Sequence, residues 1–550
     1  MLPVTRARGA FFYNSFGILQ FVLQFLLNRA ILKYVNFLRY TVTVENNRKN
    51  NTCEGIMQKI GFDNEKYLKM QSECIRDRIA SFGGKLYLEF GGKLFDDYHA
   101  SRVLPGFAPD SKVRMLLELK DQAEIVIVIS AEDIEKNKRR GDIGITYDLD
   151  VLRLIDAFRN IGLFVGSVVI THYRAQHTAD AFEKRLNALG VKTFRHYTIP
   201  EYPSNIPLIV SENGFGKNDY IETSRSLVII TAPGPGSGKM ATCLSQLYHD
   251  NKRGIKSGYA KFETFPVWNL PLKHPVNVAY EAATADLNDV NMIDPYHLEA
   301  YGETAVNYNR DIEIFPVLNA MFEKIYNASP YKSPTDMGVN MAGSCIFDDD
   351  AVCDAARQEI IRRYYATACK VREGNAEQSE IYQQELLMNS MHISTENRPV
   401  VAAALAVAER TEQPAAAIEL PDGKIVTGKT SSLLGASSAV LLNALKELAG
   451  IDDSVHLISP SVIEPISQMK VTHLGNHNPR LHMDEILIAL SISATVNENA
   501  AKAIEALPQL RHCEAHSTVI LSHVDATVFS KLGLNLTCEP KYQTKKLYHG

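Results

Sequence analysis

The chain has 550 residues, of which 45% are hydrophobic and 22% are charged, and its formal net charge is -5 at pH 7. This composition excludes a wholly disordered chain and a multi-span membrane protein, and the length predicts more than one domain. Because basic residues are not in surplus, the charge balance argues against nucleic acid as a partner.

The first 56 residues differ in composition from the rest of the chain. Residues 11–38 are rich in Phe and Leu, but polar side chains recur every fourth residue and two basic residues interrupt the second half, so the segment is a poor membrane span. No good cleavage site of a secretory signal follows it. We interpret residues 1–56 as a mis-assigned start, with translation beginning at Met57. A disordered or peripheral, membrane-anchoring extension and a true membrane span are the alternatives, and no membrane contact is expected for the main body.

From about residue 80 to residue 330, short apolar strands alternate with helices. The strands are apolar throughout, which is typical of a sheet covered on both faces. Helices are expected at Tyr147–Asn160 and Thr178–Leu189. This βαβ pattern predicts a mostly parallel, three-layer α/β sheet in a domain of residues 57–330. The expected strands are Lys85–Phe90, Ile125–Ile129, Val165–Thr171, Val191–Thr198, Leu208–Val210 and Leu227–Thr231.

The segment TAPGPGSGKMATC, residues 231–243, forms a glycine-rich turn between the last of these strands and a helix. A loop that holds a phosphate needs a strand end, a flexible turn that directs backbone N–H groups inward, and the positive N-terminus of a helix. All three are expected here, and a lysine adds positive charge. The residues expected to bind a phosphate are Gly234, Gly236, Ser237, Gly238 and Lys239.

The turn departs from the nucleotide-binding P-loop, whose pattern is G-x-x-x-x-G-K-[ST]. Pro233 stands in the first glycine position, and Met240 stands where a hydroxyl normally ligates Mg²⁺. Thr242 comes two residues later and is expected to point away. We therefore expect a phosphate or nucleotide to bind without the usual metal geometry. A purely structural turn and a standard Mg²⁺-dependent NTPase are the alternatives.

Residues 257–311 mix polar side chains and prolines with the only Trp, and few regular helices fit this stretch. Such segments usually line a site or a subunit contact, so substrate binding and a homo-oligomer interface are both open. A second loop, residues 332–343, is expected near the glycine-rich turn. Asp133 follows a strand end, where carboxylates often bind metals, although a solvated helix start is the simpler explanation. The catalytic residues are unknown, and the candidates are Asp133, Lys261, Glu263, Asp294, Arg310 and Asp336.

The cysteines and histidines give no recognisable metal motif. Eight cysteines are spread along the chain without a Cys-x-x-Cys pair, which is typical of reduced thiols in the cytoplasm. Six histidines between residues 473 and 523 are interpreted as ordinary surface and strand residues, with a metal site as the alternative. The sequence therefore assigns no metal ligands and predicts a cytoplasmic location.

The chain changes character after residue 330. Residues 331–413 are predicted to form a helical subdomain, because apolar residues recur at spacings of three and four. Residues 414–550 are predicted to form a smaller α/β unit, in which Pro421-Asp422-Gly423 is a turn between two strands and residues 437–448 are a helix.

This smaller unit resembles the opening of the cytidine deaminase fold over the segment AAAIELPDGKIVTGKTSSLLGASSAVLLNALKELAG. In that family, the helix after the hairpin carries a zinc ligand and a proton-shuttling Glu, and a later turn supplies two cysteines. Here Ser437-Ser438-Ala439-Val440 and the segment SPSVIEPI, residues 459–466, occupy the matching places. The resemblance concerns topology only, and deamination is disfavoured because the zinc ligands and the Glu are missing.

Four segments carry a wider resemblance, namely LYLEFGGKLFDDYHASRVLPGF, APGPGSGKMATCLSQLYHDN, FETFPVWNLPLKHPVN and AAAIELPDGKIVTGKTS. From residue 57 onward, the chain resembles a bacterial family of roughly 500-residue proteins catalogued as a domain of unknown function, of the UPF type. The resemblance implies a large α/β part with the P-loop-like turn, a helical subdomain and a C-terminal unit of deaminase-like topology. The family implies no reaction.

These observations favour a cytoplasmic protein that binds a phosphorylated small molecule at the glycine-rich turn. The expected ligand is a nucleotide, with ATP as one candidate, or another phosphorylated metabolite, and the expected chemistry is of the transferase or kinase type. A non-catalytic ligand-sensing or assembly protein is the main alternative. A dinucleotide-dependent oxidoreductase is disfavoured, because GPGSGK lacks the G-x-G-x-x-G order. Whether the protein is an enzyme, and its substrate and subunit number, are left open.

Overall fold

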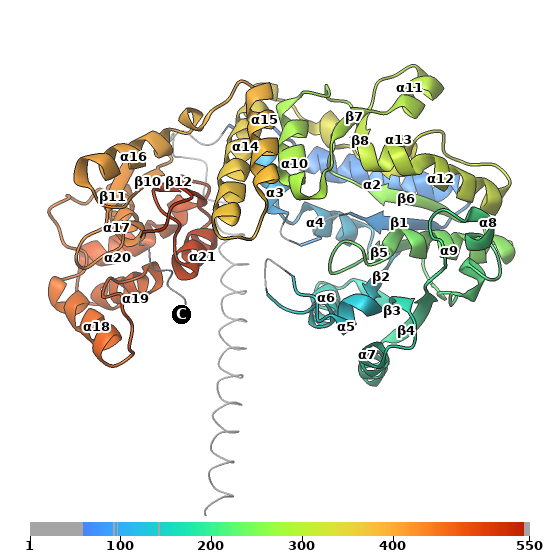
Figure 1. Ribbon diagram of the computed structural model, residues 1–550, viewed down its shortest axis with the longest axis horizontal. Coiled ribbons are helices and arrows are strands. Elements are labelled where there is room, and N and C mark those ends of the chain that lie inside the picture. The colour runs from blue at the N-terminus through green and yellow to red at the C-terminus, as the bar shows by residue number, and fades with distance from the viewer. Residues whose placement is uncertain (1–58, 92–93, 96, 141–143, 544–550) are drawn as a thin grey trace, which may run out of the picture. The chain divides into compact units, whose positions relative to one another are not determined.

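The computed structural model describes residues 59–91, 94–95, 97–140 and 144–543 (Figure 1). The interpretation of residues 1–56 lies outside these described residues. Among the helices that are described, none is both long enough and apolar enough to cross a membrane.

The larger sheet has seven strands in the order β4-β3-β2-β5-β1-β6-β9, and all its neighbouring pairs are parallel (Figure 1). The expected α/β architecture with a parallel sheet is thereby confirmed. Strands β1, β2 and β5 are buried along their whole length, as a sheet covered on both faces requires. The strands are β1 (Leu86–Phe90), β2 (Ala123–Ser130), β3 (Phe164–Tyr173), β4 (Lys192–Tyr197), β5 (Leu227–Thr231), β6 (Gly258–Phe262) and β9 (Gly338–Val339).

Helices cover both faces of this sheet, and side chains alternate between the two faces along each strand. In β1, Leu86 and Leu88 belong to the apolar cluster that includes α2, α4, α6 and α7. Tyr87 belongs to the cluster on the opposite face, which includes α9 and α12. The helices of this part are α2 (Asn64–Ser81), α3 (Tyr98–Val103), α4 (Ser111–Glu118), α5 (Ala131–Glu135), α6 (Tyr147–Asn160), α7 (His177–Ala188), α8 (Ile206–Ile209), α9 (Lys239–Lys252), α10 (Pro275–Ala283), α11 (Pro295–Tyr301), α12 (Asn309–Tyr326) and α13 (Pro334–Met337).

The strand order determines where the glycine-rich turn lies. Strand β5 pairs with β2 on one side and with β1 on the other. Because all these strands are parallel, the segments that follow β1, β2, β5 and β6 leave from the same edge of the sheet. Ligands of open α/β sheets bind at this carboxyl edge, where the chain connections change direction.

Two local predictions differ from the structure. The strand expected at Leu208–Val210 is wrong, because Leu208 and Ile209 belong to a short helix, α8, whose first turn is capped by the Asn205 side chain, and Val210 is its C-cap residue. The stretch 257–311 is more regular than expected, with strand β6, helices α10 and α11, and the antiparallel pair β7 (Asn291–Ile293) and β8 (Val306–Tyr308). Both helices begin with a proline after a capping side chain, a start signal that the sequence analysis overlooked.

Three long helices follow where the sequence predicted a helical subdomain: α14 (Asp349–Arg372), α15 (Gln378–Ser390) and α16 (Pro399–Thr411). Strand β9 still belongs to the larger sheet, although it lies beyond the expected boundary at residue 330. Helix α16 packs against the smaller sheet, because Val400 and Ala404 form an apolar cluster with Ala417. The boundaries of the structural parts are therefore less sharp than the sequence suggested.

The smaller sheet has four strands in the order β11-β10-β12-β13. The turn at Pro421-Asp422-Gly423 joins β10 and β11 as an antiparallel hairpin, whereas β12 and β13 are parallel. The strands are β10 (Ala415–Glu419), β11 (Ile425–Lys429), β12 (Glu514–Ser517) and β13 (Asn535–Cys538). The helices are α17 (Ala436–Leu448), α18 (Pro460–Thr472), α19 (Met483–Ser493), α20 (Glu498–Glu505) and α21 (His523–Leu532).

Buried ion pairs connect α14 to both structural parts. On one side, Glu359 accepts hydrogen bonds from Arg102 of α3 and from Arg362 of its own helix. Burial alone would raise the pKa of Glu359, but the surrounding guanidinium groups and His99 hold it well below its usual value. On the other side, Arg362 donates to Glu514 of β12 at 2.8 Å.

Arg398 completes this network inside the smaller unit. Its side chain is 1% exposed and forms an ion pair with Glu514. The same guanidinium donates to the backbone carbonyls of Ala515, at 3.1 Å, and Asn535, at 2.8 Å. A single cation thus satisfies groups on both parallel strands, β12 and β13.

We expect Arg398→Met to lower the free energy of unfolding by about 3 kcal/mol or more, because it removes one of the two guanidinium partners of the Glu514 carboxylate and the shared donor to two backbone carbonyls. Urea denaturation followed by circular dichroism measures this change. Arg357→Met is the matched control, because Arg357 pairs with Asp354 on the surface, and it should cost about 1 kcal/mol or less. Equal effects of the two substitutions would contradict the role assigned to Arg398.

Candidate active site at the carboxyl edge of the larger sheet

The glycine-rich turn connects β5 to α9, as the sequence predicts. Gly236 and Gly238 have φ values of 76° and 86°, in the left-handed region that favours glycine. Gly234 is required for a different reason, because a Cβ added there would lie 2.2 Å from the Tyr147 hydroxyl. The turn therefore requires glycine at Gly236 and Gly238 for its backbone conformation, and at Gly234 for close packing against Tyr147.

Side-chain hydroxyls hold the turn through its carbonyl oxygens. Thr171 at the end of β3 donates to the Ser237 carbonyl at 2.7 Å, and the Ser237 hydroxyl donates to the Gly234 carbonyl at 2.9 Å. The Thr242 hydroxyl donates to the Gly238 carbonyl at 2.9 Å. These bonds use carbonyl oxygens of the turn, and the N–H groups of residues 234, 236, 238 and 239 donate to no other described residue. The turn therefore presents hydrogen-bond donors at the head of a helix.

Lys239 is the first residue of α9 and forms no hydrogen bond or ion pair with any described residue. Its charge acts on Cys243, one helical turn further along. Burial raises the pKa of the Cys243 thiol well above its usual value, Glu89 raises it further, and Lys239 opposes the shift. Lys239 and Glu89 are thus close to the same buried thiol, on the side of the sheet that α9 covers.

A cluster of buried charged groups lies on the same face, at the ends of β1 and β6. We call Glu89, Tyr259, Lys261, Glu263 and Asp311 the β6 cluster. Lys261 Nζ lies 2.7 Å from a Glu263 oxygen and also forms an ion pair with Asp311 at the start of α12. The Tyr259 hydroxyl donates to Glu89 at 2.8 Å. The three carboxylates are each 8% exposed, so they are largely shielded from water.

The β6 cluster shifts the proton affinities of its members. Burial alone would lower the pKa of Lys261, but Asp311 and Glu263 raise it above its usual value, so the lysine stays charged. The pKa of Glu263 is raised by burial and by the neighbouring carboxylates Asp311 and Glu89, which outweigh Lys261. A carboxyl group with a raised pKa is suited to accept and return a proton.

Of the predicted catalytic candidates, the structure brings Lys261 and Glu263 together in the β6 cluster. Arg310 lies next to Asp311 in sequence but forms an ion pair with Asp289 at 3.1 Å, and its side chain is 58% exposed. Asp133 lies in α5 and pairs with Lys138 at 3.2 Å.

Asp294 and Asp336 belong to a separate group around α11 and α13. Asp294 caps α11 by accepting from two backbone N–H groups, and it accepts from the Thr335 hydroxyl at 2.6 Å. Asp336 accepts from the Tyr301 hydroxyl at 2.8 Å and from the Lys332 N–H at 2.9 Å. Their contacts stabilise local structure, and within the described part of the chain neither carboxylate forms a hydrogen bond or ion pair with the β6 cluster.

The sequence analysis missed Glu89, Tyr259 and Asp311 as site residues. A signal for Glu89 was present, because it is the one charged residue in the apolar strand LYLEF, and a buried charge in a covered sheet requires a partner. Asp311 and Tyr259 lie at the two ends of a 53-residue stretch in which many polar residues were equally good candidates.

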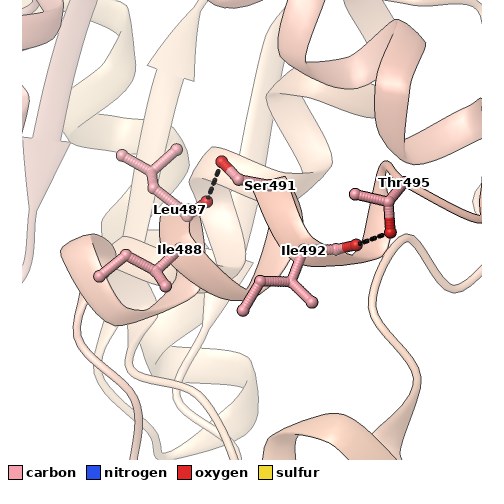
Figure 2. A pocket seen from close by; sticks show the side chains of 5 residues that line it. All are labelled: Leu487, Ile488, Ser491, Ile492 and Thr495. Atoms are coloured by element: carbon pink, nitrogen blue, oxygen red, sulfur yellow. Dashed lines mark hydrogen bonds between the residues drawn. The ribbon is translucent and has the colours of Figure 1, made fainter.

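Other features offer fewer chemical groups. A shallow apolar hollow lies on α19, lined by Leu487, Ile488, Ser491, Ile492 and Thr495 (Figure 2). Its two hydroxyls, of Ser491 and Thr495, donate to carbonyls of α19, at 2.8 and 2.7 Å. The hollow has no ionisable side chain and is unsuited to phosphate chemistry.

Among the described residues, one group combines three ligands of metal-binding type, namely His274, Asp349 and Cys353.

Comparison with known proteins identifies the protein family that the chain matches. The N-terminal model of the domain of unknown function DUF1846 matches residues 60–392, and its C-terminal model matches residues 396–548. A UPF0371 protein of Streptococcus pyogenes serotype M28 is 58% identical over 492 residues, which is 90% of this chain and 100% of the relative. A UPF0371 protein of Streptococcus uberis is 59% identical over the same shares of both chains.

Two alanine substitutions separate backbone strain from packing in the turn. Gly236→Ala should lower the free energy of unfolding by roughly 1–2 kcal/mol, because its φ is left-handed but an added Cβ meets nothing within 4 Å. Gly238→Ala should cost more, because the added Cβ would also lie 3.2 Å from Thr171. Thermal melting of both variants measures the difference, and a larger loss for Gly236→Ala would contradict this geometry.

The raised pKa of Glu263 predicts a pH dependence of stability. Between the ordinary glutamate pKa of about 4.3 and the higher value in the folded chain, the folded state keeps a proton that the unfolded state loses. The free energy of unfolding should therefore fall as pH rises through this window, and Glu263→Gln should abolish that contribution. Melting temperatures from pH 4 upward test this, with Glu313→Gln as a control for loss of one carboxyl group. If the wild-type chain instead gains stability relative to Glu263→Gln as pH rises, the pKa of Glu263 is not raised and the prediction is wrong.

Proposed function

The chain belongs to the DUF1846 family of bacterial proteins, also called UPF0371, and we propose that it binds the phosphate of a nucleotide or other phosphorylated small molecule at Gly234–Lys239. The observation that carries the proposal is the set of N–H groups in the turn that donate to no described residue, at the N-terminus of the 14-residue helix α9. Such groups bind an anion without any rearrangement of the backbone.

The free-energy contributions of the N–H groups, the helix N-terminus and Lys239 favour a phosphate over a neutral ligand. Hydrogen bonds to a charged group contribute about 1.5–3 kcal/mol each, roughly twice the value for neutral pairs. The positive end of a helix adds about 0.3–1 kcal/mol, and up to about 2 kcal/mol in a partly buried site. Lys239 adds a full charge with no competing carboxylate bonded to it among the described residues.

The contacts also support phosphate binding without the metal geometry of a P-loop. Met240 follows Lys239 and cannot ligate Mg²⁺. The nearest hydroxyl of α9 belongs to Thr242, which is buried and donates to the Gly238 carbonyl of its own helix. Neither side chain supplies the hydroxyl that normally holds the ion beside the phosphates.

We propose that the β6 cluster supplies the chemistry when the protein acts as a transferase or a related enzyme. Glu263 has the raised pKa of a general acid or base, and Lys261 can neutralise negative charge that develops on a substrate. Cys243 connects the two regions, since it is influenced by both Glu89 and Lys239. A ligand-sensing protein would need the turn but not the proton affinity of Glu263.

For the C-terminal unit we propose a deaminase-like topology without deaminase chemistry. The antiparallel hairpin β10–β11, with β12 beside β10 and β13 parallel to β12, supports this topology. At the start of α17, Ser437 and Ser438 are buried, and the Ser438 hydroxyl donates to the Leu481 carbonyl at 3.0 Å. These hydroxyls pack the helix and offer neither a zinc ligand nor a proton-shuttling carboxylate.

We expect Lys239→Ala to weaken binding of phosphorylated ligands at least tenfold, which corresponds to about 1.4 kcal/mol. Thermal-shift measurements with ATP, other nucleotides and sugar phosphates identify ligands of the folded state, and isothermal titration calorimetry gives the affinities. Lys252→Ala is the matched control, because it removes a lysine from the other end of α9, where it pairs with Glu212. The proposal is wrong if none of these ligands binds, or if Lys239→Ala binds them as tightly as the wild type.

A further inference from the structure

Three side chains suited to transition metals converge at the beginnings of α10 and α14. His274 precedes the first residue of α10, Asp349 is the first residue of α14, and Cys353 lies one helical turn later. His274 and Cys353 are each 8% exposed, whereas the Asp349 side chain is 64% exposed. The group therefore has two buried ligands and one side open to solvent.

The distances between their polar atoms are close to those of a tetrahedral zinc site. His274 Nε2 lies 3.5 Å from Cys353 Sγ and 3.0 Å from Asp349 Oδ1, and Cys353 Sγ lies 3.7 Å from the other Asp349 oxygen, Oδ2. Ideal zinc bond lengths with tetrahedral angles give about 3.5 Å between N and S, about 3.3 Å between N and O, and about 3.5 Å between O and S. When Asp349 contributes a single oxygen, the three ligand atoms all lie within 4.8 Å of one another, so one ion can reach all of them after a small adjustment of the carboxylate.

The local fold places these ligands by ordinary helix-start rules. Pro275 at the first turn of α10 fixes the position of His274 as the N-cap residue. Asp349 and Cys353 are four residues apart on α14 and therefore lie on the same face of that helix. The adjacent carboxylates Asp348 and Asp350 make this helix start strongly negative, which attracts a cation.

We propose that His274, Asp349 and Cys353 bind a divalent first-row transition metal, with Zn²⁺ as the foremost candidate. Imidazole, carboxylate and thiolate together are the ligand set of zinc rather than of Mg²⁺ or Ca²⁺, which select oxygen atoms. The fourth position faces the solvent beside Asp349 and is available to water or a substrate atom. This site shares no residue with the glycine-rich turn or the β6 cluster, so it does not depend on the function proposed for them.

Metal binding requires a change of protonation that the energies allow. His274 Nδ1 accepts a hydrogen bond from the Val276 N–H at 3.3 Å, so in the neutral ring Nε2 carries the proton and donates it to Asp349. Coordination at Nε2 moves this proton to Nδ1 and breaks the cap. The Cys353 thiol proton leaves to solvent and the sulfur binds as a thiolate. The free energy of zinc binding to protein ligands is much larger than that of one helix cap, so a three-ligand site offsets the lost cap.

A nucleophilic role for Cys353 fits the geometry less well. In a catalytic triad, the carboxylate binds the ring nitrogen opposite the one that faces the nucleophile. Here Asp349 and Cys353 both face Nε2 of His274, while a backbone N–H occupies Nδ1. Burial and Asp349 also raise the pKa of the thiol to about 11, so it is not activated.

Cobalt titration of the full chain tests the site. Protein freed of metal by EDTA should bind one Co²⁺ per chain, with a near-ultraviolet thiolate-to-cobalt charge-transfer band, and Zn²⁺ should displace the cobalt. Cys353→Ser should abolish the band. Asp349→Asn should weaken Co²⁺ binding at least tenfold, whereas Asp350→Asn, which removes the neighbouring exposed carboxylate, should change it less than threefold. Asp349→Asn should keep the melting temperature of the wild type. A loss of Co²⁺ binding in this variant then reflects the missing ligand and not a failure to fold.

His274→Asn separates ligation from capping, because asparagine is a good N-cap residue and cannot replace the imidazole as a zinc ligand. This variant should fold and fail to bind Co²⁺ tightly. The proposal is overturned if the wild-type chain shows no charge-transfer band. It is equally overturned if the band persists in Cys353→Ser, or if Asp349→Asn and Asp350→Asn weaken Co²⁺ binding to the same extent.

Discussion

Parallel pairing of β1, β2, β5 and β6 is the constraint on which the candidate active site depends. Parallel strands deliver all their following segments to one edge, so residues from 89 to 311 can meet there although they are far apart along the chain. The position of β5 between β2 and β1 directs the glycine-rich turn to the middle of this edge. The Thr171 hydroxyl from β3 then holds the turn by donating to the Ser237 carbonyl, a bond that uses no N–H group of the turn.

The same sheet explains why the charged groups near the turn occur in sets. A strand covered on both faces cannot hold an isolated charge, because desolvation costs several kcal/mol. Lys261 is therefore surrounded by Glu263 and Asp311, and Glu89 is hydrogen-bonded by Tyr259. With three carboxylates and one lysine in the β6 cluster, one carboxyl group is left with a raised pKa. Burial together with this surplus of carboxyl groups is what raises the pKa of Glu263.

The two proposed sites both lie at helix N-termini but favour ions of opposite charge. At α9, glycines and Lys239 leave the positive end of the helix uncompensated, which favours an anion. At α14, three consecutive aspartates overcompensate the positive end, and a histidine and a cysteine complete a set of cation ligands. Helix geometry alone does not choose between these outcomes. The side chains of the first turn determine the sign of the ion that is favoured.

Several parts of the structure followed from the sequence alone. Apolar strands and helix stops determined the α/β class, the limits of β5 and α6, and the hairpin at Asp422-Gly423, because each of these depends on residues close together in the chain. The glycine-rich turn was recognised for the same reason, and Lys261 and Glu263 were among its candidate partners.

Only the tertiary structure decided which polar residues meet. Glu89 and Asp311 join Lys261 through strand order and the approach of α12, and His274 meets Cys353 across 79 positions of sequence. Local patterns carry no information about such pairs, because contacts between distant residues depend on how whole elements pack. The short helix α8 in place of a strand has a related cause, since Asn205 and Pro207 outweighed three apolar residues. The periodicity of the sequence determined the helices and strands of this protein, whereas their packing determined which polar side chains meet.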